Sequence, residues 1–270
     1  MMNNYQSFFI FLIIFTSLFS YWLNSRQINH VLKNKSKVPK EFSKIVKPKD
    51  HKKAAEYTIA KTKFSSFELV VSSLILYFLT LGGGINLINN LIGPYFENTL
   101  LSGSFIIVST FLFLSLIGIP SSIYSQFVIE EKFGFNKMKL KLFWMDTFKT
   151  ILLTIIIATP IAYAALWIIF NLGNLWWIWL WGFISIVLLL VNIFYPIVKQ
   201  LFNEFKPLKD KVLKSNLEKL LKKCGFVSSG LFVMNGSLRS THGNAFFGGF
   251  GKTKRIVFFD TLLKKLSHKE

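Results

Sequence analysis

The stretch Leu175–Val198 reads LWWIWLWGFISIVLLLVNIFYPIV and contains no charged side chain. A helix needs about 20 mostly apolar residues to cross a bilayer. Four further stretches meet this requirement: Tyr5–Leu23, Phe67–Ile92, Ser104–Phe127 and Phe148–Leu172. Hydrophobic residues make up 52% of the chain, which is more apolar surface than a soluble domain of 270 residues buries. The sequence therefore predicts a mainly α membrane protein with about five transmembrane helices in residues 1–200.

The basic residues predict how these helices are oriented. The stretches Asn24–Lys63 and Val128–Lys149 carry 12 and 5 Lys and Arg residues, and the sequence from Lys199 onward carries 15, which together are all 32 in the chain. The connection Asn86–Leu101 has none. The positive-inside rule then places the N-terminus outside and the C-terminal region in the cytoplasm. Because no basic residue precedes the first apolar stretch, a membrane anchor is favoured over a cleaved signal.

The net charge of +19 is also compatible with a nucleic acid partner. Its concentration between the apolar stretches instead indicates membrane topology and attraction to anionic membrane lipid, so we expect no nucleic acid partner. A first span without an organelle address suggests a bacterial plasma membrane. The oligomeric state is not indicated by any feature of the sequence.

Residues that disturb helices interrupt three of the predicted spans. Pro120 and Pro160 each remove a helix hydrogen bond and permit a kink, which can shape a cavity or be purely structural. The triplet Gly82–Gly84 predicts close helix approach or a break. Cys224 is the sole cysteine, which excludes an internal disulfide and a cysteine-based zinc cluster.

Residues 201–270 have the pattern of a small α+β region. An amphipathic helix follows Pro207 and ends at Gly225, and Leu231–Met234 is a short apolar strand before an Asn-Gly turn. The segment Arg239–Asp260 then reads as two strands, His242–Phe247 and Arg255–Phe259, joined by a glycine-rich turn. A helical turn over Thr261–Leu266 comes next.

The residues Ser267–Glu270 match a capping box, with Ser at the N-cap and Glu at the third helical position. This predicts that a new helix starts at Ser267. We therefore expect the 270 residues to be the N-terminal portion of a longer protein, interrupted in the first turn of that helix.

Motif chemistry alone predicts no catalytic centre. The four histidines, His30, His51, His242 and His268, form no H-E-x-x-H pair, the spacing that places two zinc ligands on one helix face. The segment Gly248–Lys252 is glycine-rich and basic, but it lacks P-loop spacing and precedes a strand, so a hairpin turn is favoured over phosphate binding. The segment Glu130–Asn136 is read either as a charged surface loop or as a functional one.

Several segments together resemble the type I CAAX prenyl protease family of integral-membrane zinc metallopeptidases. The most specific are His242–Phe247 (HGNAFF) and Lys254–Leu263 (KRIVFFDTLL), where the family typically has H-S-N-A-Y-F and K-R-I-V-L-F-D-T-L-L. The other matching segments are Ile129–Asn136 (IEEKFGFN), Asp146–Lys149 (DTFK), Pro207–Leu208, Cys224–Phe226, Met234–Ser237 and Arg239–Ser240.

The resemblance implies a chamber of membrane helices, followed by the first part of a gluzincin-type α+β peptidase domain over residues 201–270. It further implies that Asn244, Ala245, Phe246 and Phe247 form an edge strand that pairs with an extended substrate, with His242 beside it. The substrate would be a membrane-associated peptide or a lipidated protein. Phe246 lacks the hydroxyl of the family tyrosine, which removes a side-chain hydrogen bond but not strand pairing.

The resemblance also implies Zn²⁺, held in the family by H-E-x-x-H on the helix that follows. Because that motif is absent here, we expect no catalytic residue and no metal ligand within these 270 residues, and no activity of the chain alone. The alternative hypothesis is a non-catalytic membrane protein that binds peptide or lipid in a helical chamber.

Overall fold

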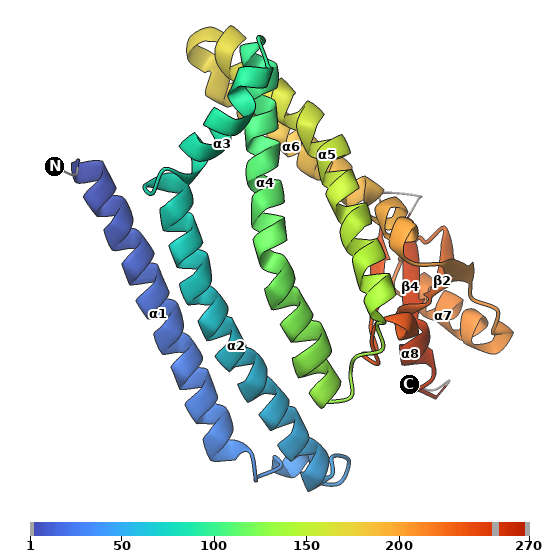
Figure 1. Cartoon of the computed structure of the whole chain (residues 1–270). Helices are drawn as coiled ribbons and strands as arrows, with labels where there is room; N and C mark the ends of the chain where they lie inside the picture. The colour runs from blue at the N-terminus through green and yellow to red at the C-terminus, as the bar shows by residue number, and fades with distance from the viewer. Residues whose placement is uncertain (1–2, 250–253, 268–270) are drawn as a thin grey trace. The chain divides into compact units, whose positions relative to one another are not determined.

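The computed structural model describes residues 3–249 and 254–267, and it comprises two compact units, residues 1–133 and 134–270. Figure 1 shows that long helices dominate the chain. Five of the described helices are long and apolar enough to cross a membrane, which confirms the predicted fold class. Their apolar side chains are largely exposed, as expected of surfaces that contact lipid.

The first unit contains three of these five helices. Its elements are α1 (Asn4–Asn34), α2 (Pro48–Thr80), α3 (Gly84–Ile92) and α4 (Thr99–Tyr124), with a π-helical turn at Ser125–Glu130 and 3-10 turns at Lys40–Phe42 and Gly93–Tyr95. Each long helix begins at a local signal. Asn3 and Gln6 form a capping box, Pro48 occupies the first turn of α2, and the Asn98 side chain accepts hydrogen bonds from two backbone N–H groups of α4.

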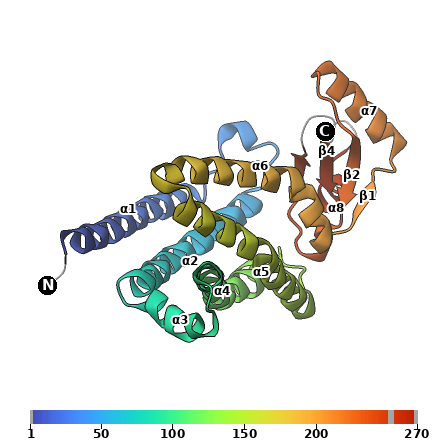
Figure 2. The ribbon, with the colours of Figure 1, turned by 90° about the horizontal axis from the view of Figure 1, so that it is seen from above.

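Polar side chains join α1 to α2, which lie side by side in Figures 1 and 2. The hydroxyls of Ser17 and Ser73 are 2.8 Å apart, and the Asn24 side-chain amide donates to Ser66 Oγ at 3.1 Å. Small polar residues allow two membrane helices to approach closely, and they bond across the interface.

The predicted boundaries of the second span were wrong. The stretch Phe67–Ile92 is not one helix, because α2 ends at Thr80 and the chain turns at Gly83, whose φ is +80°. Of the two alternatives for Gly82–Gly84, close helix approach or a break, the structure shows the break. The basic stretch between the first two spans is also mostly helical: α1 continues to Asn34 and α2 starts at Pro48. Hydropathy marks the apolar part of a helix, whereas Lys and Ala extend the helix itself into the polar region.

The second unit begins with a pair of helices, α5 (Leu140–Asn171) and α6 (Trp176–Phe202), separated by a 3-10 turn at Gly173–Leu175. Gly173 supplies the left-handed conformation of this turn, with φ +60°. Pro160 lies inside α5 and in the wall of an apolar cavity of about 640 Å³ between α5 and α6. Pro120 of α4 lines a cavity in the first unit, so both predicted kink residues border cavities.

A four-stranded sheet follows α6. The strands are β1 (Phe205–Pro207), β2 (Gly230–Met234), β3 (Ala245–Gly248) and β4 (Arg255–Phe259), in the order β1-β2-β4-β3. The pair β2–β4 is parallel and the other two pairs are antiparallel. Val257 on β4 is fully buried at the centre of the sheet. The helix α7 (Lys211–Lys223) lies beside the sheet in both views, and α8 (Asp260–Leu263) follows β4 (Figures 1 and 2).

Most elements of residues 201–270 were predicted, with two differences. β1 was missed, because three residues are too short for a periodic pattern. The strand expected from His242 begins only at Ala245. The helix after Pro207 starts at Lys211, where Asp210 caps it by accepting from the Leu213 N–H. Part of the glycine-rich turn and residues 268–270 of the predicted new helix lie outside the described residues.

Candidate functional site

The strand β3 forms one edge of the sheet within the described residues. The Phe259 N–H donates to the Asn244 carbonyl at 2.9 Å, so Asn244 and Phe259 form a hydrogen-bonded pair. Such pairs alternate along an antiparallel ladder. In the observed register, Phe246 therefore bonds to β4, whereas the backbone N–H and C=O groups of Ala245 and Phe247 point to the free edge. Those outward groups are what an extended peptide needs in order to add a strand.

The Asn244 side chain satisfies the first outward donor. Its Oδ1 accepts a hydrogen bond from the Ala245 N–H at 2.8 Å. An exposed edge with unpaired donors invites unwanted pairing, and a side-chain cap limits it. A peptide that pairs at this position must displace the Asn244 amide, and that amide is then available to the peptide.

The two faces of β3 differ in their surroundings. On one face, the half-buried Phe246 ring contacts Tyr195 of α6 at 6.3 Å between centroids. The Lys199 ammonium lies 4.0 Å from the centre of the Phe246 ring and 4.8 Å from that of Tyr195. This cation–π arrangement holds β3 against α6 without the hydroxyl that the family tyrosine would carry. On the other face, Phe247 is 69% exposed and meets Phe226 edge-on.

His242 lies in the connection that leads into β3. Its ring stacks on Phe135 with 4.3 Å between centroids, and its carbonyl accepts a hydrogen bond from Thr261 Oγ1 at 2.7 Å. The Phe135 carbonyl in turn accepts from the Thr241 N–H at 3.0 Å. The segment before α5 therefore pairs with the approach to β3, and Asn136 in that segment is buried. Phe135 and Asn136 are thus part of a packed connection, whereas Glu131, Lys132 and Gly134 are exposed as in a surface loop.

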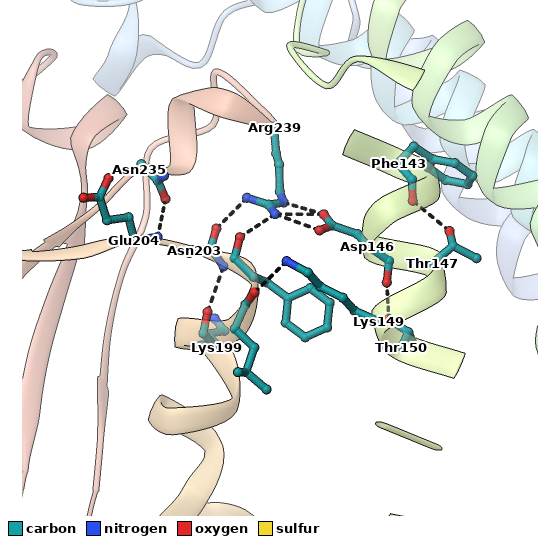
Figure 3. Close-up of polar contacts among 12 residues, drawn as sticks. Phe143, Asp146, Thr147, Lys149, Thr150, Lys199, Asn203, Glu204, Asn235 and Arg239 are labelled. Carbon is teal, nitrogen blue, oxygen red and sulfur yellow. Dashed lines mark hydrogen bonds and ion pairs between the residues drawn. The ribbon is translucent and has the colours of Figure 1, made fainter. Parts of the chain in front are cut away.

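Arg239 links the sheet region to α5 and to the end of α6 (Figure 3). Its guanidinium donates to both carboxylate oxygens of Asp146, which lies near the start of α5, at 2.9 and 3.1 Å. It also donates to Asn203 Oδ1 at 2.8 Å and to the Phe202 carbonyl at 2.6 Å at the end of α6. The planar fork of arginine suits this arrangement of acceptors, which a lysine cannot match.

Further polar contacts hold the same region. The Lys149 ammonium donates to the Leu201 carbonyl at 2.9 Å, so it joins α5 to α6 (Figure 3). The Asn235 side chain accepts from the Glu204 N–H at 3.0 Å. The Asp260 carboxylate accepts from the Ser237 N–H at 2.9 Å and from the Ser237 hydroxyl. The sequence did not predict these polar contacts, although Asp146 and Arg239 both lie in segments that resemble the family.

The described residues do not fit a zinc site. Across residues 3–249 and 254–267, His, Cys, Asp and Glu do not gather in a group of three or more that could hold a metal ion. His242, the histidine nearest to β3 in sequence, stacks on an aromatic ring. The chemical groups that the described site presents are the outward backbone N–H and C=O groups of β3.

The fold defines an integral multi-pass membrane protein that carries a small α+β region with β3 at one edge of its sheet. The family model described as "CAAX prenyl protease N-terminal, five membrane helices" matches residues 27–204, and that described as "Peptidase family M48" matches residues 207–270. The chain belongs to the CAAX prenyl protease family of peptidase family M48, as the sequence motifs predicted.

Similar proteins support this membership. The chain is 36% identical over 260 residues to the human CAAX prenyl protease 1 homolog, and 35% identical over 258 residues to that of Mus musculus; in both cases the match covers 93% of this chain and 54% of the relative. It is 34% identical over 289 residues to the Dictyostelium discoideum homolog, covering all of this chain and 65% of that protein. The crystal structure of S. mikatae Ste24p superposes with a TM-score of 0.89 at 30% identity, covering 98% of this chain and 63% of that one.

The chain thus spans about half to two-thirds of the length of these relatives. The three named relatives come from eukaryotes and give no support to the expected bacterial membrane.

Proposed function

We propose that the chain is the membrane region and the first part of the peptidase domain of a zinc metalloendopeptidase of CAAX prenyl protease type. Its substrates are membrane-associated peptides or the prenylated C-termini of proteins. The observation that carries the proposal is the free edge of β3, with outward backbone groups at Ala245 and Phe247, in a chain of this family. Family models that meet near residue 205 support a division into residues 1–200 and 201–270.

In this proposal the chain's own residues bind and orient the substrate. An extended peptide adds to β3, and the outward N–H and C=O groups of Ala245 and Phe247 hold it in register. The Asn244 side chain turns from the Ala245 N–H toward the peptide. Phe246 keeps β3 fixed on α6, and His242 fixes the entry to the strand by stacking on Phe135.

Zinc chemistry is assigned to sequence beyond these residues. No H-E-x-x-H occurs in the 270 residues, and the relatives are longer. We propose that the motif follows residue 270 in the longer protein and that the present chain does not hydrolyse peptides alone. Stoichiometric zinc in the purified 270-residue chain, together with peptidase activity lost on chelation, would contradict this.

The topology proposal follows from the distribution of charge. All 32 Lys and Arg residues lie on one set of alternating connections, which places the sheet region in the cytoplasm and the N-terminus outside. Anionic lipid and a lipidated or membrane-associated peptide are then the partners that the sheet region meets.

The deciding experiment is to read the coding sequence past codon 270 and to assay the encoded protein. An in-frame H-E-x-x-H, with chelator-sensitive cleavage of a farnesylated peptide, supports the peptidase. A stop codon at that point supports the alternative, a non-catalytic membrane protein that binds peptide or lipid. The apolar cavity between α5 and α6 is the feature that favours this alternative.

A further inference from the structure

A second cavity lies in the first unit, away from the sheet. It has a volume of about 610 Å³ and lies between α2 and the end of α4 with its π-helical turn. Pockets that hold small ligands typically measure about 300–1,000 Å³. Its apolar wall includes Ala60, Phe64, Phe67 and Tyr124, and the rings of Phe64 and Tyr124 are 4.9 Å apart.

Two lysines, Lys63 and Lys132, also line this cavity. Within the described part of the chain, neither of them takes part in a salt bridge. The neighbouring Lys61, in contrast, forms a salt bridge: its ammonium lies 3.4 Å from Glu130 Oε1. The same oxygen accepts a hydrogen bond from the Tyr57 hydroxyl at 2.6 Å. The nearby carboxylate of Glu130 is thus directed at Lys61 and Tyr57. The Lys132 ammonium lies 5.8 Å from the centre of the Phe133 ring, so it keeps a positive charge that an anion in the cavity can meet.

The position of the two lysines matches the interface between the apolar core of a membrane and its headgroups. Lys63 is the last basic residue before the apolar part of α2, and Lys132 is the first after that of α4. The apolar wall continues from them toward the apolar sides of both helices, at Phe67 and Pro120. An occupant that is anionic at one end and hydrocarbon at the other meets both surfaces, because basic residues at this depth attract anionic lipid headgroups.

The π-helical turn Ser125–Glu130 creates this geometry. The cavity wall continues from Tyr124 to Ile129 across the turn, while Glu130 reaches α2 instead of the cavity. An inserted π turn changes which residues of a helix share a face, and such turns occur often at functional sites.

We propose that this cavity binds one anionic phospholipid, with an acyl chain along the aromatic wall and the phosphate between Lys63 and Lys132. The proposal does not depend on proteolysis, since it concerns the membrane helices alone. The bound lipid fills the space between α2 and the end of α4 and stabilises that end of the unit.

The test adds dioleoylphosphatidylglycerol or dioleoylphosphatidylcholine to the full 270-residue chain in a nonionic detergent and counts bound lipids by native mass spectrometry. We expect one tightly bound phosphatidylglycerol and much weaker phosphatidylcholine. The double variant Lys63→Gln/Lys132→Gln should bind phosphatidylglycerol about thirtyfold more weakly, since each lysine near a lipid headgroup contributes about fivefold. The matched control, Lys139→Gln/Lys141→Gln, removes two exposed juxtamembrane charges that do not line the cavity and should bind as the unchanged chain does.

A second pair of variants tests the apolar wall. Ala60→Phe fills the cavity and should abolish the tight lipid, whereas Ala54→Phe, on the same helix but outside this cavity, should retain it. A phosphatidylglycerol with a photoreactive acyl chain should label Phe64 or Tyr124. Equal binding of both lipids, equal loss in the control variants, or labelling confined to other helices would overturn the proposal. So would unchanged binding by Ala60→Phe, since the occupant would then lie elsewhere.

Discussion

Among single residues, Arg239 carries the most connections in the sheet region. The side chains of Arg239 and Asp146 are only 20% and 16% exposed. The guanidinium donates to both carboxylate oxygens of Asp146, to the Asn203 side chain and to the Phe202 carbonyl. Replacing it with lysine keeps the charge but leaves several of these acceptors without a donor. We expect Arg239→Lys to lower the free energy of unfolding by about 2–4 kcal/mol, because hydrogen bonds to charged groups and partly buried ion pairs are costly to break.

The measurement is the apparent melting temperature of the chain in detergent. The control is Lys206→Ala, whose ion pair with Glu204 has both side chains more than 60% exposed (64% and 61%). An exposed pair contributes only about 0–1 kcal/mol, so this variant should melt almost as the unchanged chain does. The double variant Arg239→Ala/Asp146→Ala should lose less unfolding free energy than the two single variants lose together, because the two side chains interact. Equal effects of Arg239→Lys and Lys206→Ala would contradict the assignment.

Sequence reasoning could not find this contact. Asp146 and Arg239 are 93 residues apart, and no local pattern pairs them. The candidate residues of β3 were named from the family motif, and the structure places Ala245, Phe246 and Phe247 in an edge strand with His242 and Asn244 just before it. The register of β3 with β4 decides which backbone groups of β3 point outward, and the sequence does not indicate this register.

Among the elements, β3 gives a direct test of peptide pairing. Phe247→Pro removes an outward N–H and leaves the pairing of Phe246 with β4 in place. The loss of one main-chain hydrogen bond should weaken the binding of an extended peptide about fivefold. The measurement is the dissociation constant of a fluorescent farnesylated peptide with the chain. Phe247→Ala keeps the N–H and removes the ring, so it separates the backbone contribution from that of the side chain; equal binding by the Pro and Ala variants would contradict the pairing.

The turn between α2 and α3 gives a test of the break that hydropathy missed. A side chain at Gly83 would meet open space, so any cost of Gly83→Ala comes from its φ of +80° alone. We expect the free energy of unfolding to fall by about 1–2 kcal/mol, the cost of a left-handed L-residue. Gly118→Ala, within α4, also places its Cβ in open space but at an ordinary helical φ, and it should leave the melting temperature unchanged or higher. If Gly83→Ala melted at the same temperature as Gly118→Ala, the predicted backbone strain of an alanine at position 83 would be contradicted.

These elements also show where prediction from sequence stops. Apolar length identified all five spans because the bilayer fixes the required length. It misplaced their ends, since Lys-rich helix such as Pro48–Lys63 continues beyond the apolar core. The parallel pairing of β2 with β4 brings Leu231 beside Ile256. The two residues are far apart in the sequence, so no short-range signal predicts that they pair.

For the molecule as a whole, the proposed orientation rests on charge and has its own test. Cys224 is exposed and is the sole cysteine, in the region proposed to be cytoplasmic. In intact cells, a membrane-impermeant maleimide should therefore leave the unchanged chain unlabelled and should label it fully after lysis. In a Cys224→Ser background, Glu97→Cys places a thiol at an exposed position in the connection that lacks Lys and Arg. That variant should react from outside in intact cells, because the positive-inside rule assigns its connection to the opposite side from the sheet. Labelling of Cys224 without lysis, or of Glu97→Cys only after lysis, would reverse the orientation and place the edge of β3 outside, away from cytoplasmic substrates.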